Sequence, residues 1–176
     1  MNRLLFYIGF TLLLFACSDD VPSEQTVEAA ATVEHDTVSD GWTSLAEHGL
    51  AMEIQFPDAM LEAGQPEVKY NSAFGRVEIT VGSDYVMHIQ RNQMPLDQVK
   101  RELHQQGVLE YVFFESNDNT LLYQTKLPTG EIVGHQTIRC MEMGDKRYHA
   151  ASDPQKDYSE FEARNLLKAI NSLRAL

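Results

Sequence analysis

The sequence predicts an α+β fold, with an antiparallel sheet of about six to eight strands covered by two amphipathic helices. Short segments of alternating apolar residues, turn signals between them and two segments with helical apolar spacing lead to this prediction. A hydrophobic fraction of 43% in 176 residues is typical of a globular chain, and this length favours one domain. Connected strands and amphipathic helices that each bury one face pack together as layers.

Four short strands are predicted before residue 91. In the hairpin formed by the last two, one register places every apolar side chain on the same face, because alternate residues of a strand point to the same side. The paired residues are Val81 with Tyr85, Ile79 with Met87 and Val77 with Ile89. The four strands cover residues 50–56, 67–70, 76–81 and 85–90.

The second half is predicted to contain a helix, a four-stranded meander and a final helix. The first helix begins at Pro95 and ends at Gly107, residue types that favour these positions. Residues 108–115 are nearly all apolar and are therefore predicted to form a central strand. The final helix begins with the capping-box pattern Ser159-x-x-Glu162. The meander covers residues 108–115, 121–127, 131–143 and 147–152.

This order of elements from Trp42 onward resembles the PsbP-like α/β sandwich. The resemblance covers roughly residues 42 to 176 and rests on the element order and on the segment HGLAMEIQFPDAM, in which a strand ends at Pro57. This fold also occurs in bacterial envelope lipoproteins. The resemblance implies a binding or assembly module rather than an enzyme.

Residues 1–16 are predicted to be a signal peptide. The apolar run from Leu4 to Ala16 spans about 20 Å as a helix, too short for the hydrocarbon core of a bilayer. The segment Leu14-Phe15-Ala16-Cys17 resembles the lipobox of bacterial lipoproteins, although Phe15 departs from the small or aliphatic residue usual there. The resemblance implies that the Cys17 thiol is diacylated, that the chain is cleaved before it and that the new amine is acylated. A chance cysteine after an ordinary signal peptide is the alternative.

Residues 17–41 are predicted to form an acidic, solvated tether between Cys17 and the domain. From Ser18 to Gly41 there are seven acids and no Lys or Arg, a composition that does not support a packed core. A partner-binding acidic segment is the alternative. Ser18 replaces the Asp that retains enterobacterial lipoproteins in the inner membrane, so the outer membrane, facing the periplasm, is the predicted location. The resemblance of Ser18-Asp19-Asp20 to the export tag of Bacteroidetes surface lipoproteins leaves the cell surface as the alternative.

The charge and cysteine content exclude several function classes. The net charge is −12, and residues 42–176 alone contain 19 acids and 13 bases, which argues against nucleic-acid binding. Two cysteines are too few for a disulfide scaffold or a four-cysteine zinc site. Cys140 is predicted to be a small buried hydrophobe. No motif predicts a cofactor or a metal.

The candidate ligand-binding residues lie in the hairpin of residues 131–152. Alternation places Cys140 and Ile138 on one side with Ala150 opposite Cys140, and it places His135, Arg139 and His149 together on the other side. These three side chains are expected either to form a polar groove or part of a metal site, or to be an ordinary solvated sheet face.

The function predicted from these patterns is that of a lipid-anchored module of the bacterial envelope without catalytic activity. Its expected partners are the membrane, through the anchor on Cys17, and another envelope protein or a small ligand. The alternative is an envelope enzyme or metal-binding protein that uses the side of the hairpin carrying His135, Arg139 and His149.

Overall fold

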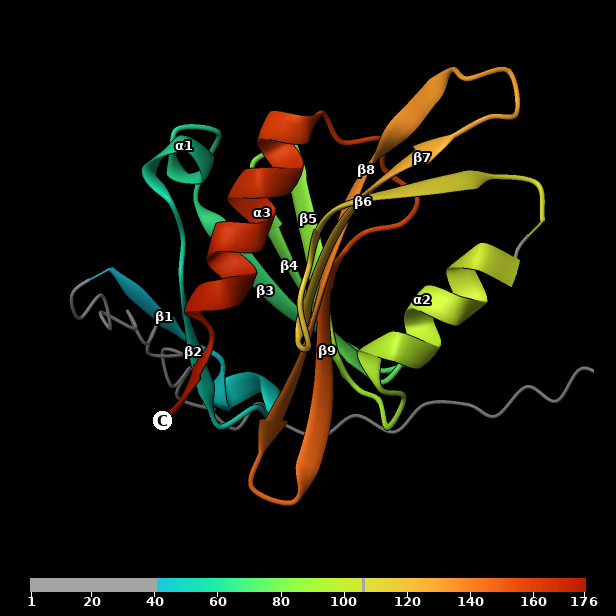
Figure 1. The fold of residues 1–176 in the computed structure, drawn as a ribbon. Coiled ribbons are helices and arrows are strands. Elements are labelled where there is room, and N and C mark those ends of the chain that lie inside the picture. The colour runs from blue at the N-terminus through green and yellow to red at the C-terminus, as the bar shows by residue number, and fades with distance from the viewer. Residues whose placement is uncertain (1–40, 106) are drawn as a thin grey trace, which may run out of the picture. The chain divides into compact units, whose positions relative to one another are not determined.

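Two antiparallel sheets and three α-helices make up residues 41–105 and 107–176, the part of the chain described by the computed structural model (Figure 1). The predictions for the signal peptide, for Cys17 and for the acidic segment up to residue 40 lie outside the described residues. No helix in the described part combines the length and apolar character needed to cross a bilayer.

The larger sheet has seven strands in the order β3-β4-β5-β9-β8-β7-β6, and all neighbours are antiparallel. Two consecutive meanders, β3 to β5 and β6 to β9, meet where β5 pairs with β9. The strands are β3 (Pro66–Asn71), β4 (Arg76–Val81), β5 (Tyr85–Arg91), β6 (Glu110–Ser116), β7 (Thr120–Lys126), β8 (Ile132–Met143) and β9 (Lys146–Ser152). The predicted α+β class and an antiparallel sheet of this size are therefore confirmed.

The smaller sheet joins the two ends of the described region. It consists of β1 (Trp42–Ser44), β2 (Met52–Gln55) and β10 (Arg174–Ala175), with β2 in the middle. The Arg174 guanidinium lies 2.5 Å from the Glu53 carboxylate and stacks 3.6 Å above the Trp42 ring. Sequence analysis missed β1, β10 and the short helices η1 (Ala46–His48) and α1 (Asp58–Leu61), because such short elements show no measurable periodicity.

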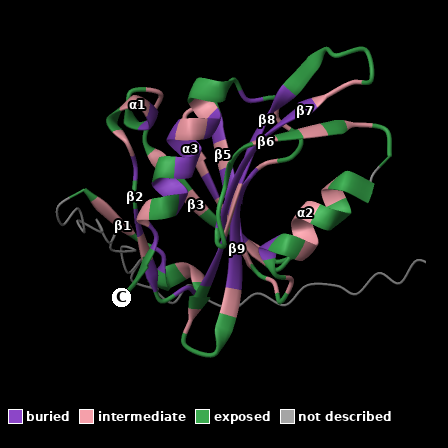
Figure 2. Ribbon diagram, in the orientation of Figure 1, coloured by how far each residue is buried: buried purple, intermediate pink, exposed green. Residues whose placement is uncertain are grey.

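Helix α3 (Glu160–Ser172) covers one side of the seven-stranded sheet and forms the main core with it (Figure 2). The predicted capping box is present: the Ser159 hydroxyl accepts from the Glu162 amide at 3.2 Å, and the Ser159 amide donates to the Glu162 carboxylate at 2.7 Å. The apolar stripe that begins at Ala163 and includes Leu166 and Ile170 faces the sheet and is fully buried.

Helix α2 (Leu96–Gln105) lies on the opposite side of the sheet from α3 (Figure 1). It follows Pro95, and Gly107 adopts φ +59°, a left-handed conformation that favours glycine after a helix. A second, smaller core forms beneath α2. It contains Leu96, Leu121, Tyr123 and Cys140, with Val99, Leu103, Tyr111, Phe113 and Ile138 packed against them.

The strand predictions were right in register for one hairpin and wrong in position for another strand. The pairs Val81–Tyr85, Ile79–Met87 and Val77–Ile89 are confirmed. The predicted central strand at residues 108–115 is instead β6, the edge of the sheet, and β7 is the strand whose residues 120–125 are all buried. Apolar content misled the prediction, because the aromatic rings of β6 pack beside α2 rather than between two covered faces.

Candidate functional site

The candidate residues in the β8–β9 hairpin do not lie on one side of the sheet. Cys140 pairs with His149, and Arg139 pairs with Ala150. The expectation that Ala150 lies opposite Cys140 was therefore wrong by one residue. His149 shares the α2 side with Cys140, whereas His135 and Arg139 point to the α3 side, so the predicted common face does not exist. Both sides of this hairpin are buried and carry polar residues, so hydrophobic alternation did not determine its register.

Arg139 binds the carboxyl end of α3. Its Nη1 donates to the carbonyl oxygens of Ile170 at 2.9 Å, Asn171 at 3.0 Å and Leu173 at 3.2 Å. Of these carbonyls, only that of Ile170 also accepts a backbone hydrogen bond within the described part, from the Leu173 amide. They carry the negative end of the helix dipole, so a cation there is stabilising. Burial lowers the pKa of Arg139. The Arg139 guanidinium is thus engaged in holding the helix to the sheet.

His135 is also held by the protein. Its Nδ1 lies 3.2 Å from the Tyr158 carbonyl oxygen, and its Nε2 lies 3.2 Å from the Gln124 side-chain amide nitrogen. One tautomer satisfies both contacts: Nδ1–H donates to Tyr158, and Nε2 accepts from Gln124. The ring stacks on Phe114 with centroids 5.8 Å apart. His135 therefore joins strand β8 to the segment before α3.

Cys140 is buried, as predicted, and its environment disfavours reactivity. Burial raises the pKa of the Cys140 thiol to about 11, so the nucleophilic thiolate is scarce at neutral pH. Across the described ranges, no group of three or more His, Cys, Asp and Glu side chains is arranged to hold a metal ion.

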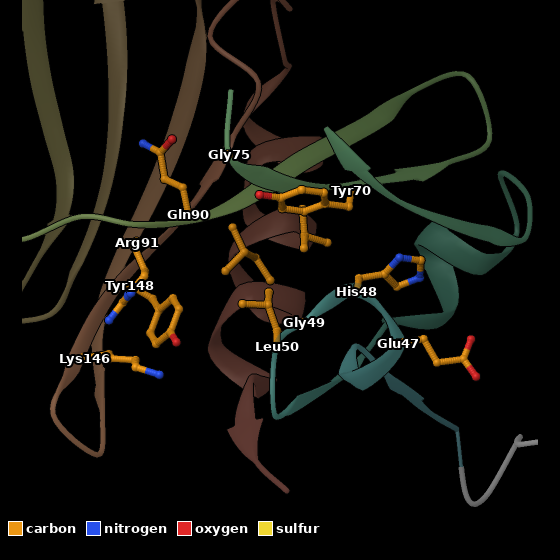
Figure 3. A pocket seen from close by; sticks show the side chains of 12 residues that line it. Glu47, His48, Gly49, Leu50, Tyr70, Gly75, Gln90, Arg91, Lys146 and Tyr148 are labelled. Atoms are coloured by element: carbon orange, nitrogen blue, oxygen red, sulfur yellow. The ribbon is translucent and has the colours of Figure 1, made fainter. Parts of the chain in front are cut away.

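A hollow of about 430 Å³ lies where strands β4, β5 and β9 approach η1, and we call it the cationic pocket (Figure 3). Its volume is within the usual range for small-molecule sites. Leu50 and Val77 provide apolar surface, and the rings of Tyr70 and Tyr148 stand on opposite walls. The remaining charged and polar lining includes Arg91, Lys146, Glu47 and His48.

Strand pairing explains why both cations reach the cationic pocket. Arg91 pairs directly with Tyr148, and Lys146 is two residues before Tyr148 on the same strand. All three side chains therefore point to the α3 side of the sheet, the side of the main core. Because Arg91 ends β5 and Lys146 begins β9, their charged groups lie at the rim of that core.

The pocket combines positive charge with apolar surface. Within residues 41–105 and 107–176, neither Arg91 nor Lys146 has a carboxylate at ion-pair distance, whereas Arg76 and Arg147 each have one and Arg164 has two. Figure 3 shows the Glu47 carboxylate directed away from the centre of the pocket. An anion that carries an apolar body matches this arrangement.

Sequence analysis missed Arg91, Lys146 and Tyr70 as candidate residues. Extending the confirmed alternation of β5 by one step, from Ile89 to Arg91, would have placed the arginine on the core side. The position of η1 beside β4, β5 and β9 depends on tertiary packing, which leaves no signal in the local sequence. Comparisons with known protein families, with curated proteins and with solved structures found no match to this chain.

Proposed function

We propose that this protein is a lipid-anchored module of the bacterial cell envelope that binds a small organic anion in the cationic pocket without transforming it. The anchor is Cys17, attached to the periplasmic face of the outer membrane, and the acidic segment of residues 17–41 links it to the domain. The resemblance of the domain to PsbP-like sandwiches remains a prediction.

The observation that carries the ligand proposal is the unpaired state of Arg91 and Lys146 beside apolar and aromatic surface. In the described part, Arg101 and Lys168 also lack a carboxylate partner, but they lie on exposed helix positions. Arg91 and Lys146, by contrast, both line one hollow. A carboxylate or similar group would form charge-assisted hydrogen bonds with both. Leu50 and the rings of Tyr70 and Tyr148 would contact the apolar body of the ligand.

Several contacts support a binding role rather than a catalytic one. His135 and Arg139 are bound to backbone carbonyls, and His149 Nε2 lies 2.7 Å from the Met94 carbonyl oxygen. The Cys140 thiol is kept protonated by burial. The side chains most suited to nucleophilic or acid–base chemistry in this hairpin are therefore engaged in structural contacts or deactivated.

Ligand binding is tested with benzoate and octanoate on the purified full chain by saturation-transfer NMR and calorimetry. Replacing both cations, Arg91→Gln with Lys146→Gln, is expected to weaken binding about tenfold or more, because two charge-assisted contacts are lost. The matched control, Arg101→Gln with Lys168→Gln, removes the same charge from exposed positions on α2 and α3. If neither anion binds, or if both double variants bind equally, the ligand proposal is wrong.

The anchor is tested separately by labelling cells with a radioactive fatty acid and fractionating their membranes. Cys17→Ser is expected to abolish labelling and release the protein from the outer membrane, because the thiol is the predicted acylation site. Cys140→Ser is the matched control and is expected to stay labelled. A Cys17→Ser protein that still carries label and sediments with the outer membrane would contradict the anchor.

A further inference from the structure

A second hollow of about 170 Å³ lies on the α2 side of the sheet, and we call it the inner cavity. Its lining contains no Asp, Glu, Lys or Arg, although the domain as a whole is rich in charge. Polar side chains dominate the part contributed by β5, β8 and β9. They are His88, Gln90, Gln136, Thr137, His149 and Ser152, and Tyr123 of β7 completes the set.

Strand pairing brings these side chains together. In the β5–β9 pair, His88 lies opposite Ala151 and Gln90 lies opposite His149, so alternate residues of both strands face α2. The core beneath α2 is built from α2, β6, β7 and β8, with no residue from β5 or β9. The helix therefore leaves this part of the sheet uncovered, and the hollow forms beside it.

Three of the lining residues are fixed by hydrogen bonds. Gln136 donates from Nε2 to the Lys156 carbonyl oxygen at 2.7 Å and accepts at Oε1 from the Ser152 hydroxyl at 2.5 Å. His149 Nε2 lies 2.7 Å from the Met94 carbonyl oxygen. Because a carbonyl oxygen only accepts hydrogen bonds, Nε2 carries the proton and Nδ1 of the neutral ring is an acceptor. The wall of the cavity is thus preorganised.

Four other lining residues have unused hydrogen-bonding groups. His88 is only 8% exposed and Thr137 is fully buried, and neither the His88 Nδ1 nor the Thr137 hydroxyl has a partner. The Tyr123 hydroxyl and the Gln90 amide make no side-chain hydrogen bond to any described residue. Gln90 also lines the cationic pocket, but Figure 3 shows its side chain directed away from Tyr70 and Leu50 of that pocket. Native proteins rarely leave a buried group such as His88 Nδ1 unpaired, because it costs stability, whereas the Tyr123 hydroxyl and the Gln90 amide line the hollow without a protein partner; together these groups point to a ligand.

The cavity is uncharged at neutral pH. Burial lowers the pKa of His88 to about 4 and lowers the pKa of His149 as well. The charges that act on His88 are the Arg76–Glu78 ion pair on the neighbouring strand and Asp153 after β9, and Arg147 acts on His149, but none of these side chains lines the cavity. A charged ligand would lose its hydration here without gaining a counter-charge, whereas a neutral ligand with hydroxyl or amide groups would satisfy the free donors and acceptors.

We propose that the inner cavity binds one uncharged sugar ring, a hexose or an N-acetylhexosamine. The volume limits the ligand to about this size, since it is below the usual range for drug-sized molecules. Tyr123, Ile138 and Pro154 supply apolar surface for the carbon face of the ring. A neighbouring hollow of about 340 Å³ shares Tyr123, Gln136 and Pro154 with the inner cavity and accommodates a substituent.

The probes are glucose and N-acetylglucosamine, with glucuronate and glucosamine as charged counterparts, titrated into the purified full chain and followed by saturation-transfer NMR. We expect at least one neutral sugar to bind and the charged counterparts to bind more weakly. Tyr123→Phe is expected to weaken binding about fivefold, because it removes one hydroxyl and keeps the ring. Gln90→Leu is expected to weaken it similarly. Tyr70→Phe, which removes a hydroxyl from the cationic pocket, is the matched control and is expected to bind as the original chain does.

Three results would overturn the proposal. The first is that neither neutral sugar binds at millimolar concentration. The second is that the charged sugars bind as tightly as the neutral ones to the chain carrying Arg91→Gln with Lys146→Gln, which lacks the cations of the cationic pocket. The third is that Tyr123→Phe and Gln90→Leu both bind unchanged. Circular dichroism and a melting curve confirm that each variant is folded, and Gln90→Leu carries the test if Tyr123→Phe is not. Benzoate binding, measured on Tyr123→Phe, is expected to be unchanged, which separates this site from the cationic pocket; Gln90 lines both hollows and is not used for this comparison.

Discussion

The two sides of the seven-stranded sheet differ in how completely they are covered. On the α3 side, one continuous core extends from β4 to β8, and its arginine and histidine side chains bind backbone carbonyls. On the α2 side, a smaller core lies under the helix, and a polar hollow remains over β5 and β9. The comparison indicates that α3 packing provides most of the stability, whereas the α2 side retains groups available for recognition.

The largest expected effect is the loss of stability caused by a substitution in the core on the α3 side. Leu166→Ala removes a fully buried side chain from the main core and is expected to lower the free energy of unfolding by about 3 to 4 kcal/mol. Leu103→Ala in α2 is the matched change at a half-buried site and is expected to cost about 1 kcal/mol. Urea denaturation measures both values. Equal losses in the free energy of unfolding for the two variants would show that the two sides of the sheet contribute equally to stability.

The next largest expected effect is a loss of folding stability in acid, through His88 on the α2 side of the sheet. The pKa of His88 is about 4 in the folded protein and about 6.5 when unfolded, so the unfolded chain binds the proton more tightly. Stability is therefore lost as pH falls from about 6.5 to about 4, by roughly 3 kcal/mol from this residue.

His88→Gln is expected to flatten that part of the pH–stability curve, measured by urea denaturation at several pH values. His104→Gln, a matched change at an exposed position of α2, is expected to leave the curve close to that of the original chain. A His88→Gln curve as steep as the original would contradict the assignment.

A smaller loss is expected when the contact between the α3 terminus and β8 is removed. Arg139→Gln loses three hydrogen bonds from a cation to helix carbonyls and is expected to cost about 2 kcal/mol in the free energy of unfolding. Arg101→Gln, at an exposed position on α2, is the control and is expected to cost less than about 0.5 kcal/mol. Indistinguishable melting curves for the two variants would show that Arg139 does not stabilise the helix end.

The smallest expected effect is at the start of α3. Ser159→Ala removes the capping hydroxyl and is expected to cost about 1 kcal/mol, because the Glu162 amide loses its partner. Thermal denaturation followed by circular dichroism measures the change. Ser159 lines neither hollow, so benzoate and sugar binding are expected to persist. A free energy of unfolding equal to that of the original chain would argue against the capping box.

Much of the fold was predictable because local signals and packing agree there. The capping box at Ser159, Pro95 before α2 and the alternation in residues 76–90 each predicted the element observed. The side assigned to His149 was wrong because polar residues occur on both sides of the β8–β9 hairpin, so a shift by one residue left no hydrophobic penalty in the sequence. The cationic pocket and the inner cavity depend on the β5–β9 pairing, which joins distant segments and is therefore outside the range of periodicity.

The small sheet has a mechanical consequence for a domain held by its amino-terminal end. A pulling force transmitted through residue 41 would act first on β1, a three-residue edge strand that pairs only with β2 within the described part and whose Trp42 ring stacks with Arg174 of β10. Peeling β1 away would break a few hydrogen bonds in turn and would leave β10 on the other side of β2. The seven-stranded sheet would bear no force until β1 had detached. The β1 strand would therefore unfold under tension before either hollow is deformed.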